Sequence, residues 1–158
     1  MSNPIDDLSK RLDTWPTYLL EVGVISTKKR TTKTETVRLG ITNAELLYIQ
    51  EHGSTVNHIP ARPVLDYTIK WANQNLLSKT IDKCVKIFLE TGDKSLVKRE
   101  MDAMAIDIQN YARDLIYKND GTFVANAPAT IEQKGFNHPL FRTGQLARSI
   151  TCHVIEIK

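Results

Sequence analysis

The chain has 158 residues, of which 41% are hydrophobic and 25% charged, with a formal net charge of +3 and two cysteines. This composition is that of one soluble globular domain, and it excludes disordered, fibrous and membrane-spanning classes. The small net charge argues against a protein that binds nucleic acid through many phosphate contacts. Two cysteines without a preceding secretory signal predict free thiols in a reducing cytoplasm, not a disulfide framework.

The first part of the chain predicts a polar lead-in and a pair of strands. Residues 1–16 are polar and allow one helical turn at 5–12. Residues 17–26 (TYLLEVGVIS) are rich in β-branched and apolar residues and predict a strand, for which residues 34–40 form a return strand. The stretch between them is either a solvated loop or a contact to DNA or an acidic partner. Its basic residues are Lys28, Lys29, Arg30 and Lys33.

Residues 42–53 carry a strong helix signal. Thr42 and Glu45 fit a capping box, in which each side chain accepts a hydrogen bond from a free backbone N–H at the helix start. Gly53 suits the position after the helix, because glycine enters the left-handed region without a Cβ penalty. Residues 54–63 (STVNHIPARP) are then extended, since two prolines disfavour helix there.

The second half predicts helices followed by a long connection and a last strand. Apolar residues at helical spacing indicate helices at 64–77, 79–92 and 95–117. The connection at 118–144 is unusually long, and connections of that length are often functional. Residues 148–157 (RSITCHVIEI) read as a strand with apolar residues on both faces, which predicts a central strand or one covered by partners.

Together these elements predict an α+β fold in a single domain, 1–158. An antiparallel sheet of about three to four strands is packed by three to four helices, with a long loop before the C-terminal strand. Within the end of that loop, Thr143 is a predicted N-cap for a short helix at 144–148.

Groups suited to catalysis or metal binding are few. His52 and His58 flank a glycine-bearing loop but lack further ligands at the spacing of a zinc site. Cys152 and His153 are neighbours on a strand and point to opposite faces, and Cys84 fits a small core residue of an apolar helix. The chain contains no phosphate-binding glycine loop, nucleophile elbow or zinc-protease motif. The sequence therefore predicts no enzyme, no cofactor and no metal site.

The segment "IPARP" (59–63) is stiffened by its prolines. The stiffness orients Arg62, whose planar guanidinium can bind a carboxylate through two hydrogen bonds. Two interpretations stay open: Arg62 meets a partner's carboxylate, or it pairs within the chain with Glu51 or Asp66.

The segment "PATIEQKGFNHPLFRTGQL" (128–146) carries two large apolar residues, Leu140 and Phe141, close to a turn. Leaving such residues bare in water is unfavourable. They either fold back onto the core or insert into a partner.

These two segments, taken in order, resemble a known family. "NAELLYIQEHGSTVNHIPARPVL" (43–65) followed by "PATIEQKGFNHPLFRTGQLARSITCHV" (128–154) is similar to the tail-completion and neck proteins of tailed bacteriophages, grouped as virion-morphogenesis or minor-tail-Z-like proteins. The resemblance covers residues 17–157 in outline. Val64 stands where the family usually has Phe, and Phe141-Arg142 where it has Ile-Asp or Val-Asp. The matching positions are Asn43-Ala44, Glu51 to Gly53, Ile59 to Leu65, Thr130 to Gly135, Pro139 to Leu146 and Ser149 to Val154.

The resemblance implies a non-enzymatic component of the virion at the head–tail junction, assembled in the bacterial host cytoplasm. It implies a hexameric ring that joins the tail to the head connector, with other neck, tail-terminator or tail-tube proteins as partners and no membrane contact. Residues 28–33 would then face the lumen and touch DNA passively. The alternative from a different class is a small nucleic-acid-binding module that uses those basic residues. A small hydrolase is a third class, disfavoured by the missing catalytic groups.

A ring needs two unlike patches on each subunit. In this interpretation Leu140 and Phe141 are the anchors of a docking loop, and Arg142 and Arg148 are its polar rim. The residues expected at subunit or partner interfaces are Ile59, Pro60, Arg62, Pro63, Pro139, Leu140, Phe141, Arg142, Thr143, Gly144, Gln145 and Arg148.

Overall fold

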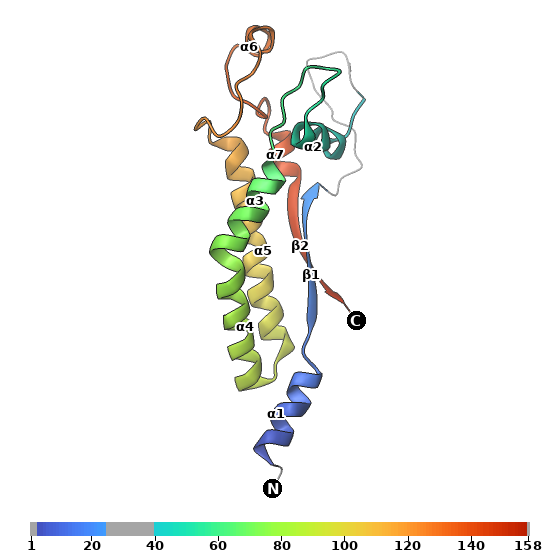
Figure 1. The fold of residues 1–158 in the computed structure, drawn as a ribbon, viewed down its shortest axis with the longest axis vertical. Helices are drawn as coiled ribbons and strands as arrows, with labels where there is room; N and C mark the ends of the chain where they lie inside the picture. The colour runs from blue at the N-terminus through green and yellow to red at the C-terminus, as the bar shows by residue number, and fades with distance from the viewer. Residues whose placement is uncertain (1–2, 25–39, 158) are drawn as a thin grey trace. The chain divides into compact units, whose positions relative to one another are not determined.

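A computed structural model describes residues 3–24 and 40–157 (Figure 1). The elements are, in chain order, α1 (Pro4–Asp13), β1 (Thr17–Val24), α2 (Asn43–His52), α3 (Val64–Ala72), the π-helix η1 (Asn73–Leu77), α4 (Ser78–Thr91), α5 (Lys94–Tyr117), α6 (Pro128–Lys134), α7 (Gln145–Ser149) and β2 (Ile150–Ile157). The α+β class is confirmed, but the described residues hold two paired strands and not the three to four expected. The return strand expected at 34–40 lies outside the described residues, apart from Gly40. No helix of the described chain is both long and apolar enough to span a bilayer.

Contacts within the chain divide it into two compact units, each assembled from segments far apart in the sequence. Unit 1 comprises Met1–Glu21, Ile69–Ile108 and Cys152–Lys158, and unit 2 comprises Val22–Thr68 and Gln109–Thr151. The borders fall inside α3, α5 and both strands. The length of the chain predicts a single domain. The borders between the two units leave no linker rich in proline or glycine in the sequence, because helices and strands run across them without a break.

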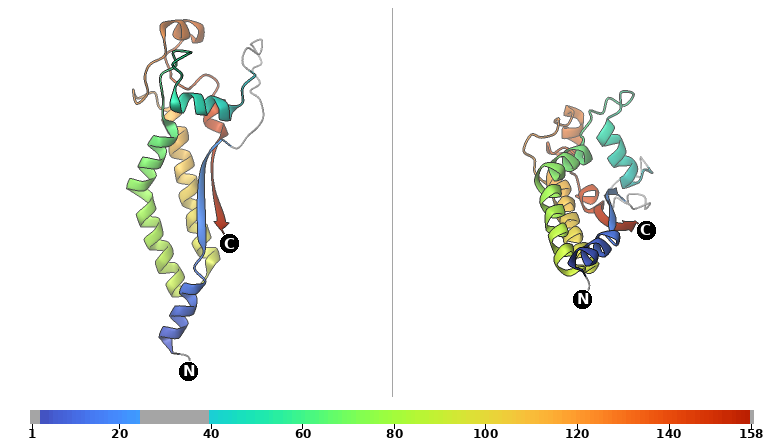
Figure 2. Two further views of the ribbon diagram at one scale, coloured as in Figure 1. Left: turned by 45° about the vertical axis from the view of Figure 1, so that its right-hand side comes forward. Right: turned by 60° about the horizontal axis from the view of Figure 1, so that its bottom comes forward.

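The helices α4 and α5 form the centre of unit 1 and run antiparallel beside each other (Figure 2). Cys84, Phe88 and Val97 make a small core between them, and the ring of Trp15 meets that of Phe88 edge-on at 5.0 Å between centroids. Gly92 ends α4 with φ at 67°, as its place after the apolar pattern predicts. Gly92 thus ends α4 and allows the chain to turn, and the burial of apolar side chains stabilises the packing of α4 on α5.

Residues 64–91 form one continuous helical run, whereas the apolar pattern predicts two helices. The interval 73–77 is a π-helix, so the run changes its hydrogen-bond spacing without stopping. No proline or glycine interrupts it, and Asn75 Nδ2 donates to the carbonyl of Trp71 at 2.8 Å. The expected break at residue 78 is therefore wrong, because a shift in the apolar pattern needs only one wide turn.

The helix α1 confirms the helical turn expected at 5–12 and is attached to α4 through its polar side. Arg11 Nη1 donates to the carbonyl of Leu89 at 2.8 Å, near the C-terminus of α4, where helix carbonyls lack helical partners. Ile5, Leu8 and Leu12 share one face of α1 and are 72%, 42% and 52% exposed. The apolar stripe of α1 is thus left open by the described chain.

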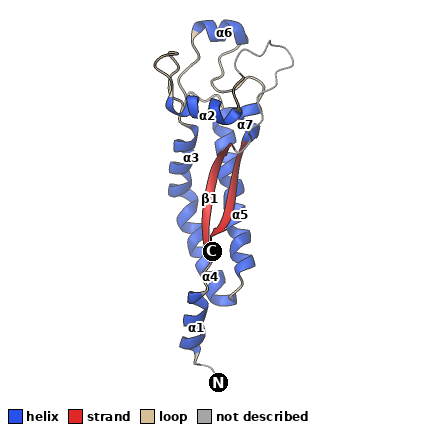
Figure 3. Ribbon diagram, turned by 90° about the vertical axis from the view of Figure 1, so that its right-hand side faces the viewer, coloured by secondary structure: helices blue, strands red, loops and turns tan. Residues whose placement is uncertain are grey.

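The strands β1 and β2 form a two-stranded antiparallel ribbon (Figure 3). The first residue of β2, Ile150, is fully buried, whereas Ile155 and Ile157 are 43% and 48% exposed. Leu19 of β1 is likewise exposed. The expectation of a central β2 is therefore wrong for the described chain, because its second apolar face remains in solvent.

In unit 2, α2 and α3 are joined by their end groups. The predicted capping box is confirmed: the backbone N–H of Glu45 donates to Thr42 Oγ1 at 3.1 Å, and that of Thr42 donates to Glu45 Oε2 at 2.6 Å. Further along α2, the carboxylate of Glu51 accepts hydrogen bonds from the backbone N–H groups of Leu65 and Asp66, each at 2.9 Å. Glu51 therefore caps the free N-terminus of α3. The core beneath consists of Leu47, Val64, Ala112, Ile116, Leu146, Ala147 and Ile150.

Replacing Glu51 by Gln removes the charge and one of the two acceptor oxygens at the start of α3. We expect the free energy of unfolding to fall by about 1 to 2 kcal/mol. Urea denaturation followed by circular dichroism measures the change. Glu132→Gln, at an exposed position of α6, is the matched control and should stay within about 0.5 kcal/mol of the unaltered chain. Equal midpoints for the two variants would contradict the capping role.

Candidate functional site

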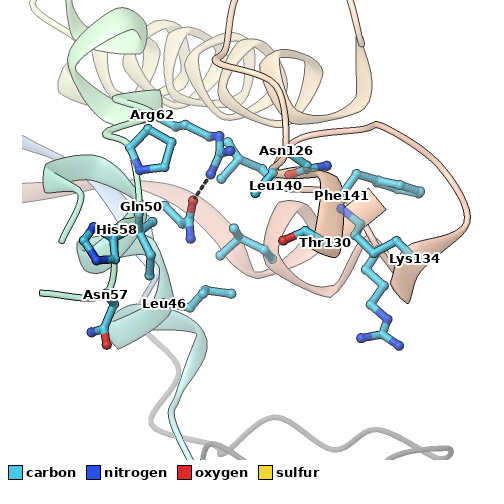
Figure 4. Close-up of a pocket in the computed structure, with 15 residues that line it drawn as sticks. Leu46, Gln50, Asn57, His58, Arg62, Asn126, Thr130, Lys134, Leu140 and Phe141 are labelled. Atoms are coloured by element: carbon cyan, nitrogen blue, oxygen red, sulfur yellow. Dashed lines mark hydrogen bonds between the residues drawn. The ribbon is translucent and has the colours of Figure 1, made fainter. Parts of the chain in front are cut away.

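A recess of about 470 Å³ lies within unit 2 (Figure 4). One side is formed by α2 and residues 57–62, and the other by residues 126–142 with α6. The expectation of extended chain throughout 54–63 is wrong, because residues 55–58 form a turn that the antiparallel bridge between Ser54 and Ile59 closes. The two stretches that carry the family resemblance therefore meet here, although they are far apart in the sequence. We call this recess the cationic pocket; its polar lining includes Gln50, His58, Arg62, Asn126, Lys134 and Arg142.

Arg62 holds the two sides together. Its side chain is 6% exposed, and its Nε donates to the carbonyl of Val124 at 3.0 Å. Nη1 donates to Gln50 Oε1 at 2.9 Å, and Nη2 to the carbonyl of Ala125 at 3.2 Å. Burial lowers the pKa of Arg62 from its usual value. Arg62 is thus bound within the chain, but its partners are neutral and are not the carboxylates expected.

The connection at 118–144 is folded and contains the helix α6. Pro128 begins α6, and Gly135 ends it with φ at 78°. After the helix, Lys134 Nζ donates to the carbonyl of His138 at 2.7 Å, and the His138 ring nitrogen Nε2 lies 2.8 Å from the carbonyl oxygen of Ile116. These bonds return the chain to the end of α5.

Leu140 and Phe141 fold back onto the core. Both are half-buried and pack against its buried residues. The ring of Phe141 stacks on that of His138, with 4.7 Å between centroids, and meets that of Tyr117 at 5.8 Å. The described chain therefore shows the first of the two alternatives, and both residues form part of the pocket wall; their role as interface anchors stays a prediction.

Two residues of the pocket have strained backbones. His58 has φ at 51° and Leu140 has φ at 62°, and they are the two non-glycine residues with positive φ in the described chain. Left-handed conformations disfavour side chains that carry a Cβ and cost roughly 1 to 2 kcal/mol. Such strain tends to gather at functional sites. Here both strained residues line the same recess.

Three cationic side chains line the pocket. Arg62, Lys134 and Arg142 all contribute to its lining, and no Asp or Glu is among the described residues that form it. The pKa of Lys134 is lowered, first by burial and then by the charges of Arg62 and Arg142. In addition, Asn126 Nδ2 is buried and has no hydrogen-bond partner among the described residues. The lining thus brings three positive charges and an unpaired amide donor close together.

This arrangement suits the binding of a group that is part apolar and part anionic. Leu46, Leu140 and Phe141 supply an apolar wall beside the cations. The chemistry matches a group that carries an anionic oxygen next to an apolar side chain. Within the described residues, no three of His, Cys, Asp and Glu gather where a metal ion could be held.

The predicted interface residues divide into two halves. Those that line the pocket are Ile59, Pro60, Arg62, Leu140, Phe141 and Arg142. Those that do not are Pro63, Pro139, Thr143, Gly144, Gln145 and Arg148. Lys28, Lys29, Arg30 and Lys33 lie outside the described residues. Gln50, Asn126 and Lys134 are additions from the structure. Among these, Lys134 lies in the matching stretch Thr130 to Gly135, which could have pointed to it.

The turn before α7 differs in detail from expectation. The N-cap is Gly144, with φ at 72°, and not Thr143. The carbonyl of Thr143 accepts a hydrogen bond from Arg148 Nη2 at 2.9 Å, so Arg148 closes the turn from within the chain. A Cβ at Gly144 would come 2.9 Å from Arg148 Nη1, the end of a side chain that can move aside, so it is the positive φ that requires glycine here.

Neither cysteine forms a disulfide. Cys84 is buried in the core of unit 1, as predicted, and its Sγ lies 3.8 Å from the carbonyl oxygen of Val97. Burial raises the pKa of Cys152 to about 11. A thiol with so high a pKa is almost fully protonated near neutral pH, so Cys152 is a poor nucleophile there.

A search of known protein families, curated proteins and solved structures gives no match to this chain. Its function therefore has to be inferred from the sequence, from the pocket and from the surfaces around it.

Arg62→Lys should unfold the chain more easily. The lysine ammonium cannot reach Gln50 and the two carbonyls of residues 124 and 125 together, so buried acceptors lose their donors. We expect a loss of about 2 to 3 kcal/mol in the free energy of unfolding, measured by urea denaturation. Arg142→Lys, at an exposed position of the same pocket, should change it by less than about 0.5 kcal/mol. Similar effects of the two variants would contradict the structural role of Arg62.

His58→Gly tests the strain. Glycine relieves roughly 1 to 2 kcal/mol of left-handed strain and loses roughly 0.4 to 1 kcal/mol through its freer unfolded chain. We therefore expect a net gain in stability of about 0.5 kcal/mol or more, visible as a higher melting temperature. His52→Gly, at the last residue of α2, should instead lower stability. A loss of stability in His58→Gly would mean that the backbone at this position is not strained.

Proposed function

We propose that this chain is a structural component of a tailed-phage virion, a protein that acts by binding copies of itself and other virion proteins. More specifically, we propose a head–tail junction (neck) or tail-completion protein that assembles in the host cytoplasm into a ring and joins the tail to the head connector. The order and spacing of the two resembling stretches support this interpretation. Their convergence on one pocket gives those stretches a common role.

The observation that carries the proposal is that, within the described residues, each strand of the ribbon of β1 and β2 has one edge without a neighbouring strand. Proteins usually protect an edge strand with lysine, proline or a bulge, because its unpaired N–H and C=O groups can pair with another chain. The two strands, TYLLEVGV and ITCHVIEI, contain no Lys, Arg or Pro and one acidic residue each, Glu21 and Glu156, and within the described residues neither has a second neighbour. The ribbon is therefore suited to be completed by another subunit.

The outer face of the ribbon supports the same conclusion. Leu19, Ile155 and Ile157 are 44%, 43% and 48% exposed on it. Burying the exposed part of such side chains contributes roughly 25 cal/mol for each Å² removed from water. Each chain thus offers two unlike surfaces, the ribbon and the cationic pocket. Unlike surfaces are what a closed ring with head-to-tail contacts requires.

Ile155→Lys tests the proposal. A charged side chain on the outer face of the ribbon opposes strand addition and apolar burial, while the exposed position lets the fold persist. We expect the fraction of protein that pellets with purified phage tails to fall at least 10-fold. Ile106→Lys, at an exposed position of α5, is the matched control and should pellet as the unaltered chain does.

Circular dichroism should show both variants folded. An unaltered chain that ignores tails yet shifts DNA in low salt, with the shift lost when Lys28, Lys29 and Arg30 become Ala, would replace this proposal by the nucleic-acid-binding module.

A further inference from the structure

We infer that the outer face of the ribbon receives the apolar face of α1 from a second copy of this chain. The inference rests on the proposed function, because it names one of the contacts by which subunits would form a ring. We call Ile5, Leu8 and Leu12 the α1 stripe. It lies in unit 1, as do the residues of the outer face that it would cover.

The outer face of the ribbon is apolar and is left uncovered by the described chain. In β1, the exposed residues Thr17, Leu19 and Glu21 alternate with half-buried ones, so one face packs inward and the other points to solvent. Ile155 and Ile157 of β2 are exposed on the same outer face. A sheet buries an apolar face by packing it against another layer of secondary structure. The outer face is therefore suited to receive a further element.

The α1 stripe has the form of that further element. Its three residues follow the spacing i, i+3 and i+7, which places them on one face of the helix, and all three are exposed. The stripe rises about 10 Å along the helix axis, and residues 155–157 of an extended strand span roughly 7 Å. The stripe is thus long enough to cover the exposed apolar residues of the ribbon.

The helix α1 is held away from the outer face of its own chain. Arg11 Nη1 donates to the carbonyl of Leu89 at 2.8 Å, and the ring of Trp15 meets that of Phe88 edge-on. Three residues separate α1 from β1, and the last of them is the buried Pro16, whose ring fixes φ. Folding α1 back over β1 would break these contacts. The α1 stripe is therefore offered to another molecule.

The charges around the two faces favour a protein as that molecule. The ribbon carries Glu21 and Glu156 and no Lys or Arg. In α1, three aspartates outnumber Lys10 and Arg11, so the helix side chains are also acidic on balance. Neither face attracts the phosphates of nucleic acid or of an anionic membrane surface. An apolar helix face packed on an apolar sheet face meets the needs of both.

A second copy of the chain supplies the missing layer in equal number. Each copy carries one α1 stripe and one outer face, so it can give α1 to one neighbour and receive α1 from the other. The two surfaces are unlike, and such a head-to-tail contact closes into a ring or extends into a filament. The contact thus accounts for both uncovered faces of unit 1 with a single kind of partner.

Cysteine cross-linking in the full-length chain tests the contact. Leu8→Cys places a thiol in the α1 stripe, and Ile155→Cys places one on the outer face. Mild oxidation of an equal mixture should yield at least 10-fold more disulfide-linked heterodimer than dimer from either variant alone. The native thiols compete poorly, because Cys84 is buried and burial raises the pKa of Cys152 to about 11.

The double variant, Leu8→Cys with Ile155→Cys, separates a contact between copies from one within a chain. We expect a ladder of linked oligomers, whose largest member reports the number of subunits in a ring. A disulfide closed within one chain, seen as a monomer whose mobility changes on reduction, would show that α1 covers its own ribbon. That result would overturn the inference.

Leu8→Cys mixed with Ile106→Cys is the matched control, because Ile106 is exposed on α5 and belongs to neither face. Its heterodimer should not exceed the dimer of either variant alone, and circular dichroism should show every variant folded, since each site is exposed. The inference also fails if the Leu8 and Ile155 variants do not cross-link, or if the control cross-links equally.

The outcomes keep this contact separate from the proposed function. Tails that bind the unaltered chain while the cross-link fails would refute the contact and leave the proposed function standing. A chain that cross-links as expected but does not pellet with tails would support the contact and remove the proposed function.

Discussion

The buried guanidinium of Arg62 connects Gln50 of α2 to the backbone carbonyls of Val124 and Ala125, which lie far along the chain. Placing a full charge out of water is costly unless hydrogen bonds replace its hydration. Here three neutral oxygens do so, from Gln50, Val124 and Ala125. Because none of them is anionic, the positive charge stays unbalanced and is felt in the adjoining pocket.

The rest of the pocket depends on those hydrogen bonds. The hydrogen bonds of Arg62 hold residues 57–62 against the connection at 118–144. In this arrangement His58 and Leu140 keep left-handed conformations that neither would adopt alone. The same fold-back stacks Phe141 on His138 and directs Lys134 toward its carbonyl. Structure and charge are thus coupled, and an anionic partner would relieve the repulsion that the fold creates.

Local features of the fold could be predicted from the sequence, because their causes are local. The capping box of Thr42 and Glu45 needs only residues three apart, and Gly92 ends α4 through its own backbone freedom. The partners of Arg62 could not be predicted, because backbone carbonyls far along the chain leave no mark in the residue types. For the same reason the role of Glu51 as the cap of α3 was open, since any nearby carboxylate could have served.

The last strand shows a different limit. Apolar residues on both faces of β2 are compatible with a central strand and with an edge strand. The alternation of residues shows which face of a strand is apolar, but it does not show what packs against that face. Within the described chain β2 has one neighbouring strand, and Ile155 and Ile157 are exposed, so it is an edge strand there. In the candidate site, sequence motifs found both walls of the pocket but not Asn126, whose unpaired amide depends on tertiary packing.

Electron microscopy of the purified protein, alone and mixed with headless phage tails, would show whether this chain is a head–tail junction component. We expect rings of identical subunits, or added density confined to the head-proximal end of the tail. Isolated monomers beside bare tails would contradict that role.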